Sequence, residues 1–572
     1  MLKDCLEIFK KQYKENGEEK YITDSYVLAE GSYMLVDQEW NIKDVFEVKK
    51  KDTDRTDSRY SYFAERDYLS KLIDMNKPID GKKVIHSNNY LTFFIKKENV
   101  NPKKLTDEII ESFYNILLDP TIKYTDKEKK LMYENIEEKN GKVNEEDLIK
   151  IKSWIKENIF SIKEKYTDDK NYLKIFFERD IEIYKKESEK YVLPNIYNST
   201  QYNEIIDGAI YGLPNDNMGL NAKKPFLEHK TRKNTIPYLI DEKEVLMQKK
   251  FFDYLMNQVS EGKNNVYISE KGIEGLESGD KPKGNFSGYF LRIKKGKEVE
   301  VHDFDIITLM SEKVYDFKYK KVIPIDYEKA KQKPLDNNID TKKDLERVID
   351  RVYFYNLLSK NYFTEAKEIR INNGRLKENL ILNRIAYFNW FYKGNDKVVR
   401  SSFNKMSLEL IKDSICEDIY VKPREQFNLR WAIINYFGGS KDMADILKGL
   451  SNTVREKINL NDTSEIESDD EYYFAAGQLV SYYFSLNKSA KKMHSLLNPI
   501  LNCRTNEKLR LELTKLFRKY NYAIKKESKR FNNLQSMVFG YIPEKNIDED
   551  MFIAGYLYSS LIYEKGEEKS NG

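Results

Sequence analysis

Residues 474–484 read Phe-Ala-Ala-Gly-Gln-Leu-Val-Ser-Tyr-Tyr-Phe, and this stretch indicates how the second half of the chain folds. Its apolar side chains recur every three or four residues, which is the spacing of one face of an α-helix. Strand-like alternation nearly disappears after Asp344. The same helical spacing recurs in residues 345–357, 380–391, 427–437, 509–517 and 551–563. The sequence therefore predicts an all-α helical bundle over residues 341–572.

The first part of the chain carries both strand and helix patterns. Runs of strand length occupy residues 21–36, 40–49 and 91–96, whereas residues 105–118, 125–190 and 245–259 have helical spacing. The clearest hairpin runs from Gly288 to Phe304, and the polar stretch from Glu328 to Lys342 is the expected interdomain linker. We therefore predict an α+β protein, in which a mixed α/β N-terminal domain, residues 1–340, precedes the helical-bundle domain, residues 341–572.

The composition excludes several broad classes of protein. Aromatic residues make up 13% of the 572 residues, which is too many for a disordered chain, and 24 Gly and 13 Pro are too few for a collagen-like repeat. The three cysteines form no CxxC pair and suggest no disulfide framework, so a reducing cytoplasm fits. The N-terminus has no apolar signal core, and the longest nearly apolar run, residues 552–563, is too short to span a bilayer. The sequence predicts a cytoplasmic protein that is not embedded in a membrane.

No motif for catalysis or for a cofactor stands out. The pair His302-Asp303 is typical of metal-dependent phosphohydrolases, but such sites need further His and Asp ligands, and no second His lies near it. The sequence contains neither a GxxxxGK[ST] loop nor a GxSxG elbow. We therefore predict no catalytic residue, no metal and no cofactor. A divergent metal-dependent nuclease with Asp and Glu ligands remains an alternative.

Positive charge is concentrated in two segments. Residues 488–530 hold 13 Lys or Arg against three Glu, and residues 223–233 hold five against one. Such segments favour a polyanionic partner, because crowded cations repel one another unless anions are near. The acidic stretch at 465–471 could instead supply those anions within the chain. The candidate nucleic-acid contacts are Asn221, Lys223, Lys224, Lys230, Arg232, Lys233, Lys491, Lys492, Arg518, Lys525, Lys526 and Arg530.

Individual residue types suggest how these segments would bind. Asn221 can present a donor and an acceptor to a base edge, and the neighbouring Lys223 and Lys224 can contact phosphate or guanine. Tyr520 and Tyr522 lie among the C-terminal cations and could stack on bases. The remaining alternative is a structural scaffold that binds only other proteins.

Five short stretches together resemble a known family. They are Gly-Leu-Asn-Ala-Lys-Lys-Pro-Phe-Leu at 219–227, Phe-Ala-Ala-Gly-Gln-Leu-Val at 474–480, Lys-Lys-Met-His-Ser-Leu-Leu at 491–497, Arg-Phe-Asn-Asn-Leu at 530–534 and Ile-Ala-Gly-Tyr-Leu at 553–557. In order, spacing and position they resemble the large subunit of the type I-B CRISPR-associated Cascade surveillance complex, over essentially the whole chain. Some relatives carry a cysteine zinc ribbon that this chain lacks, so a structural zinc is not expected.

The resemblance implies a non-catalytic role in crRNA-guided interference. The N-terminal domain would lie near the crRNA handle, recognise the protospacer-adjacent motif (PAM) on double-stranded target DNA and aid duplex opening. The C-terminal domain would hold a DNA strand and stabilise the R-loop. The implied partners are crRNA, target double-stranded DNA, sibling Cascade subunits and a separate helicase-nuclease effector.

Overall fold

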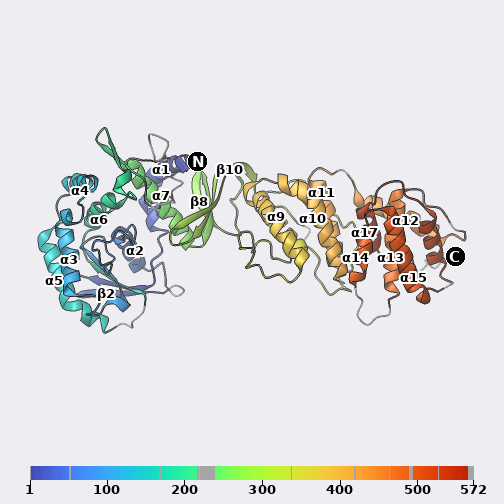
Figure 1. The fold of residues 1–572 in the computed structure, drawn as a ribbon, viewed down its shortest axis with the longest axis horizontal. Helices are drawn as coiled ribbons and strands as arrows, with labels where there is room; N and C mark the ends of the chain where they lie inside the picture. Colours follow the sequence, from blue (N-terminus) through green and yellow to red (C-terminus); the bar gives the residue numbers. More distant parts are fainter. Residues whose placement is uncertain are drawn as a thin grey trace. The chain divides into compact units, whose positions relative to one another are not determined.

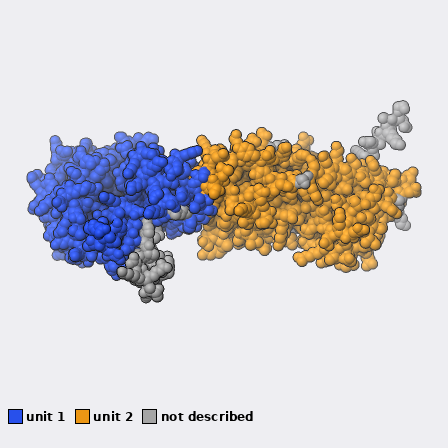
Figure 2. Space-filling model, turned by 90° about the horizontal axis from the view of Figure 1, so that it is seen from above, with its two compact units in different colours: residues 1–280, 287–306 blue, residues 281–286, 307–572 orange. Residues whose placement is uncertain are grey.

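The chain forms two compact units, which Figure 2 colours blue and orange. The computed structural model describes residues 2–49, 53–165, 170–215, 218, 239–335, 338–417, 420–439, 441–462, 464–487, 494–525 and 527–564. The first unit comprises residues 1–280 and 287–306, and the second comprises residues 281–286 and 307–572. The first unit is mixed α/β and the helices from residue 342 onward form an all-helical region, which confirms the predicted α+β class. The predicted boundary at 340–341 falls inside the second unit.

The described residues of the first unit form two four-stranded sheets, seven helices and several short elements (Figure 1). Its helices are α1 (Leu2–Glu18), α2 (Ser58–Ser70), α3 (Asp107–Leu118), α4 (Lys127–Asn140), α5 (Glu145–Lys163), α6 (Ile181–Asn195) and α7 (Glu242–Ser260). Its strands are β1 (Gly31–Val36), β2 (Ile42–Val48), β3 (Thr92–Lys96), β4 (Tyr172–Phe177), β5 (Glu204–Ile206), β6 (Ala209–Tyr211), β7 (Lys263–Ser269), β8 (Gly272–Glu277) and β9 (Asn285–Lys295), with β10 (Val299–Ser311) crossing into the second unit.

The first sheet has the strand order β2-β1-β4-β3, with β1 parallel to β4 and the other pairs antiparallel. Helices cover both of its faces. Phe63 of α2 contacts Tyr33 and Phe176 on one face, and Trp154 of α5 contacts Phe177 on the other. The sheet is therefore the centre of the core of this unit.

Strand β4 corrects the expectation that residues 125–190 are helical throughout. It lies between β1 and β3 at the centre of the sheet, and Leu173, Ile175, Phe176 and Phe177 are completely buried. A central strand buried on both faces loses the alternation of polar and apolar residues that marks a strand in a sequence.

The second sheet contains the predicted hairpin. Its strand order is β10-β9-β7-β8, and the turn between β9 and β10 is closed by a hydrogen bond from Gly296 N to Glu298 O at 3.1 Å. Both arms are longer than predicted. The predicted linker lies within the second unit, where Leu335 and Ile339 are buried and Lys342 N donates to Glu312 O.

The second unit is built from helices that pack side by side (Figure 1). They are α8 (Lys342–Phe354), α9 (Gly374–Lys393), α10 (Lys397–Cys416), α11 (Lys422–Tyr436), α12 (Met443–Asn459), α13 (Asp469–Ser485), α14 (Asn498–Leu501), α15 (Asn506–Tyr520), α16 (Lys529–Gly540) and α17 (Glu549–Leu557). Helix α13 packs against α12, α15, α16 and α17, and nearly every residue from Tyr472 to Phe484 is buried. Helix α13, which contains the stretch at 474–484, is thus the central helix of the C-terminal part of the unit. In the described part of the chain, no helix has the length and apolar character needed to cross a membrane.

Candidate nucleic-acid interface

Helix α15 separates an apolar face from a basic face. The Thr505 hydroxyl accepts a hydrogen bond from Lys508 N and caps the start of the helix. Leu509, Leu513, Leu516 and Tyr520 are buried on the side that packs against α13. The basic residues of α15 lie on its other sides, where Lys508, Lys515, Arg518 and Lys519 are exposed.

These side chains belong to a larger group that we call the terminal cationic cluster. It comprises Arg504, Lys508, Lys515, Arg518, Lys519, Lys525, Lys529 and Arg530. Seven of the eight members are exposed, and no described carboxylate lies within ion-pair distance of Arg504, Lys508, Arg518, Lys519 or Lys525. Two of the predicted contact residues, Arg518 and Lys525, are therefore cations without a described acidic partner.

The other members of the cluster interact with the chain itself. Lys515 pairs with Glu512 at 2.8 Å. Lys529 Nζ donates to Asn461 Oδ1 at 2.6 Å, and Arg530 Nε donates to Asn459 Oδ1 at 2.7 Å while its Nη1 donates to the carbonyl of Glu564. Amide and carbonyl oxygens orient Lys529 and Arg530 but do not neutralise their charge. The structure thus gives Arg530 a fixed position beside α12.

The acidic stretch at 465–471 engages other groups. Glu471 pairs with Lys457 at 2.9 Å, and Glu467 pairs with the same lysine at 3.2 Å. Asp469 accepts hydrogen bonds from the Tyr541 hydroxyl at 2.9 Å and from Lys545 N at 2.7 Å, and these bonds hold its pKa below its usual value although burial raises it. In the residues that the structure describes, these acids do not neutralise the terminal cationic cluster.

The two tyrosines proposed to stack on bases differ in exposure. Tyr520 is 2% exposed and packs edge-on against Phe484 in the core of the bundle, so the prediction for Tyr520 is wrong. Position 520 falls on the apolar face of α15, which the spacing of Leu513 and Leu516 already indicates. Tyr522 is 65% exposed and lies three residues before Lys525, and its stacking on a base stays a prediction.

Many of the predicted contact residues lie outside the described parts of the chain. These are Asn221, Lys223, Lys224, Lys230, Arg232, Lys233, Lys491, Lys492 and Lys526. Their roles remain predictions. The structure adds Lys508 and Lys519, which the set of candidate contacts omitted although their spacing in α15 places them on one face with Lys515.

His86 and His302 have ordinary structural environments. His302 Nε2 lies 3.1 Å from Glu300 Oε2 at the exposed edge strand β10. His86 bridges the Tyr172 hydroxyl, at 2.8 Å, and the carbonyl of Lys83, at 3.0 Å, and burial lowers its pKa. Across the described ranges, no three His, Cys, Asp or Glu side chains come together as a possible metal site. All three cysteines are unpaired.

Comparison with known proteins adds no relative. No family model, curated protein or solved structure matches this chain. We therefore infer a function from the sequence motifs and from the exposed cations of the terminal cationic cluster.

Proposed function

We propose that this protein is the non-catalytic large subunit of a crRNA-guided type I-B CRISPR interference complex. In this role it recognises the protospacer-adjacent motif, aids duplex opening and stabilises the R-loop. It acts in the cytoplasm with crRNA, target double-stranded DNA and sibling subunits, and helps recruit a separate helicase-nuclease. The proposal extends to this chain the properties of the family that its motifs resemble.

One observation carries the part of the proposal that concerns nucleic acid. The exposed cations Lys508, Arg518, Lys519 and Lys525 have no described acidic partner, and the nearest acidic stretch is engaged by Lys457 and the loop at 541–545. Phosphate groups of a nucleic-acid strand would neutralise such a surface, and contacts to the backbone suffice where base pairing with a guide supplies specificity.

Photo-crosslinking in the assembled complex tests this role. A benzoylphenylalanine at position 522, beside the cluster, should crosslink to target or displaced DNA, whereas the same group at Leu382, 71% exposed on α9, should not. Equal crosslinking at both positions, or none at 522, would contradict the proposal.

Recognition of the protospacer-adjacent motif is tested separately. The double change Asn221→Ala and Lys223→Ala should reduce the preference of the complex for targets with the correct motif. Unchanged preference would remove the motif-reading role but leave the strand-holding role intact.

Incubation of the purified chain with Mg²⁺ or Mn²⁺ and labelled DNA tests the nuclease alternative. A gel shift at low and moderate salt tests the alternative of a scaffold that binds only proteins.

A further inference from the structure

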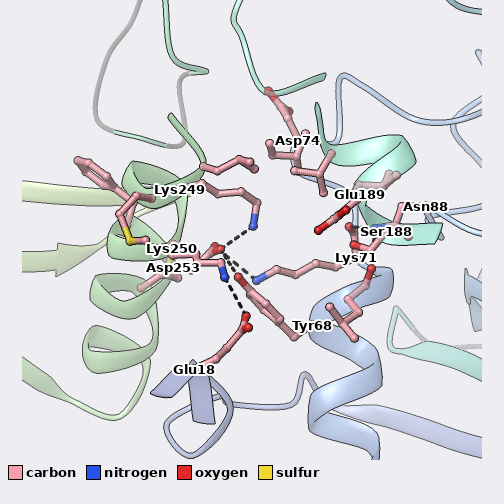
Figure 3. A pocket seen from close by; sticks show the side chains of 18 of the residues that line it. Glu18, Tyr68, Lys71, Asp74, Asn88, Ser188, Glu189, Lys249, Lys250 and Asp253 are labelled. Carbon is pink, nitrogen blue, oxygen red and sulfur yellow. Dashed lines mark hydrogen bonds and ion pairs between the residues drawn. The ribbon is translucent and has the colours of Figure 1, made fainter. Parts of the chain in front are cut away.

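A cavity of about 450 Å³ lies within the first unit, between the end of α2 and the helices α6 and α7 (Figure 3). Leu72, Val192, Leu246, Met247 and Met256 give it a largely apolar wall. Sites for small molecules span roughly 300–1,000 Å³ and combine such walls with a few polar groups. The cavity therefore has the size and lining of a ligand site.

A cluster of buried charges borders this cavity. In Figure 3, dashed lines converge on Asp253 from Lys249, Lys71 and Tyr68. Asp253 lies 2.6 Å from Lys249 Nζ and 3.7 Å from Lys71 Nζ. The Tyr68 hydroxyl donates to Asp253 Oδ2 at 2.9 Å. Two ammonium groups thus share one carboxylate at the wall of the cavity.

The two ammonium groups around Asp253 exceed its single negative charge by one, and the neighbouring ion pair does not change this excess. Lys174 of β4 pairs with Asp67 of α2 at 2.5 Å, and that pair is self-contained. Counting Lys71, Lys249 and Lys174 against Asp253 and Asp67 leaves one positive charge in excess. Among the residues that the structure describes, no third carboxylate lies within ion-pair distance of these three lysines.

Lys71 is the member of the cluster that a ligand can reach. Its side chain is 33% exposed, whereas that of Lys249 is 11% and that of Lys174 is 8% exposed. Burial lowers the pKa of Lys71, and the charges that act on it are those of Asp253, Lys249, Asp67 and Lys174. An uncompensated charge is costly at such a site, so an anion beside Lys71 would be held strongly.

Four other charged side chains of the wall, Glu18, Lys185, Glu189 and Lys250, lie in ion pairs. Lys250 lies 3.4 Å from Glu18, and Lys185 lies 2.8 Å from Glu182. Glu189 pairs with Lys139 at 3.3 Å. Asp74, Lys243 and Glu298 also line the wall, but among the described residues neither carboxylate lies within ion-pair distance of Lys71 or Lys249, so the local excess of charge stays at Lys71.

We propose that this cavity binds a small organic monoanion whose carboxylate lies beside Lys71 and whose aliphatic body covers the apolar wall. One negative charge matches the local excess of one cation around Asp253, and the methionine side chains can adapt to the shape of the body. This inference does not rest on the proposed function.

Calorimetry with decanoate as the probe tests the proposal on the full chain. Decanoate should bind with a stoichiometry of one, and decanol, which has the same body without the charge, should bind at least tenfold more weakly. Lys71→Gln should weaken decanoate binding by a similar factor. This variant should fold, because the Lys249–Asp253 pair remains and the excess charge is gone.

Lys185→Gln is the matched control, because Lys185 also lines the cavity but is 42% exposed and paired with Glu182. It should leave the affinity within about twofold of the wild type. Equal affinity for decanol and decanoate, or an unchanged affinity in Lys71→Gln, would overturn the proposal. Displacement of decanoate by saturating single-stranded DNA would also overturn it, because the excess charge would then serve nucleic-acid phosphates.

Discussion

Gly477 of α13 and Gly555 of α17 face the backbone of the opposite helix where the two helices cross. A Cβ atom on Gly477 would lie 2.2 Å from the carbonyl oxygen of Phe552, and one on Gly555 would lie 2.1 Å from the carbonyl oxygen of Phe474. Gln478 Nε2 reinforces the crossing by donating to Gly555 O at 2.6 Å. Two of the motifs that carry the family resemblance thus form one helix–helix contact.

A methyl group at this crossing should destabilise the second unit. Gly477→Ala or Gly555→Ala would force the helices apart, and we expect a loss of about 3 kcal/mol or more in the free energy of unfolding. Gly449→Ala is the control, because its Cβ would meet nothing within 4 Å in the middle of α12, and it should stabilise by about 0.5–1 kcal/mol. Urea unfolding of the three variants measures both effects. Equal stability of all three would refute the close crossing.

A buried ion pair joins α11 to α17. Arg430 is 1% exposed, and its Nε and Nη2 lie 2.8 Å and 2.9 Å from the two carboxylate oxygens of Asp550. Asp550→Asn leaves the buried guanidinium uncompensated and should cost about 3–5 kcal/mol in chemical denaturation.

Glu549→Gln provides the comparison for this pair. Glu549 pairs with Lys412 at 2.8 Å but is 37% exposed, so its replacement should cost less than about 1 kcal/mol. Similar losses in the two variants would show that burial does not decide the strength of the Arg430–Asp550 pair.

Lys422 should make stability depend on pH in the alkaline range. Burial lowers its pKa to about 8 in the folded chain, and its ammonium group lies 4.0 Å from the centre of the Tyr355 ring. Between pH 8 and about 10.4, the unfolded chain binds a proton that the folded chain does not, so stability decreases as pH falls through this window and is constant below it.

Lys422→Met removes this dependence. Its free energy of unfolding relative to the wild type should rise by about 1–3 kcal/mol between pH 10 and pH 7.5, as denaturation at several pH values would show. Lys405→Met, at a site 86% exposed, should show no such trend. A constant difference between Lys422→Met and the wild type would mean that Lys422 remains fully charged.

The predictable parts of the fold were those with a regular pattern and local contacts. The hairpin from 288 to 304 and the helix at 105–118 follow from alternation and from helical spacing, and both are present as β9–β10 and α3. Strand β4 could not be recognised, because a strand buried on both faces has no alternation. The unit boundary was misplaced because the polar stretch after Glu328 folds back against the end of β10.

The candidate interface was predictable in charge but not in detail. The sequence shows that residues 488–530 are basic, and the helical spacing of α15 accounts for its exposed cations. It does not show that Asn459 and Asn461 hold Arg530 and Lys529, because those contacts join residues distant in sequence. The imbalance of charge around Asp253 likewise arises only when α2, β4 and α7 come together.

The central claim is that the terminal cationic cluster contacts nucleic-acid phosphates, and the salt dependence of DNA binding by the assembled complex tests it most directly. The double change Arg518→Gln and Lys525→Gln should reduce the slope of log affinity against log salt by about 1.4 for a single strand, since each phosphate contact contributes about 0.7. Lys405→Gln should leave the slope unchanged. A shallower slope in the double variant alone is the result that we predict, and a slope equal to that of the wild type would contradict the account.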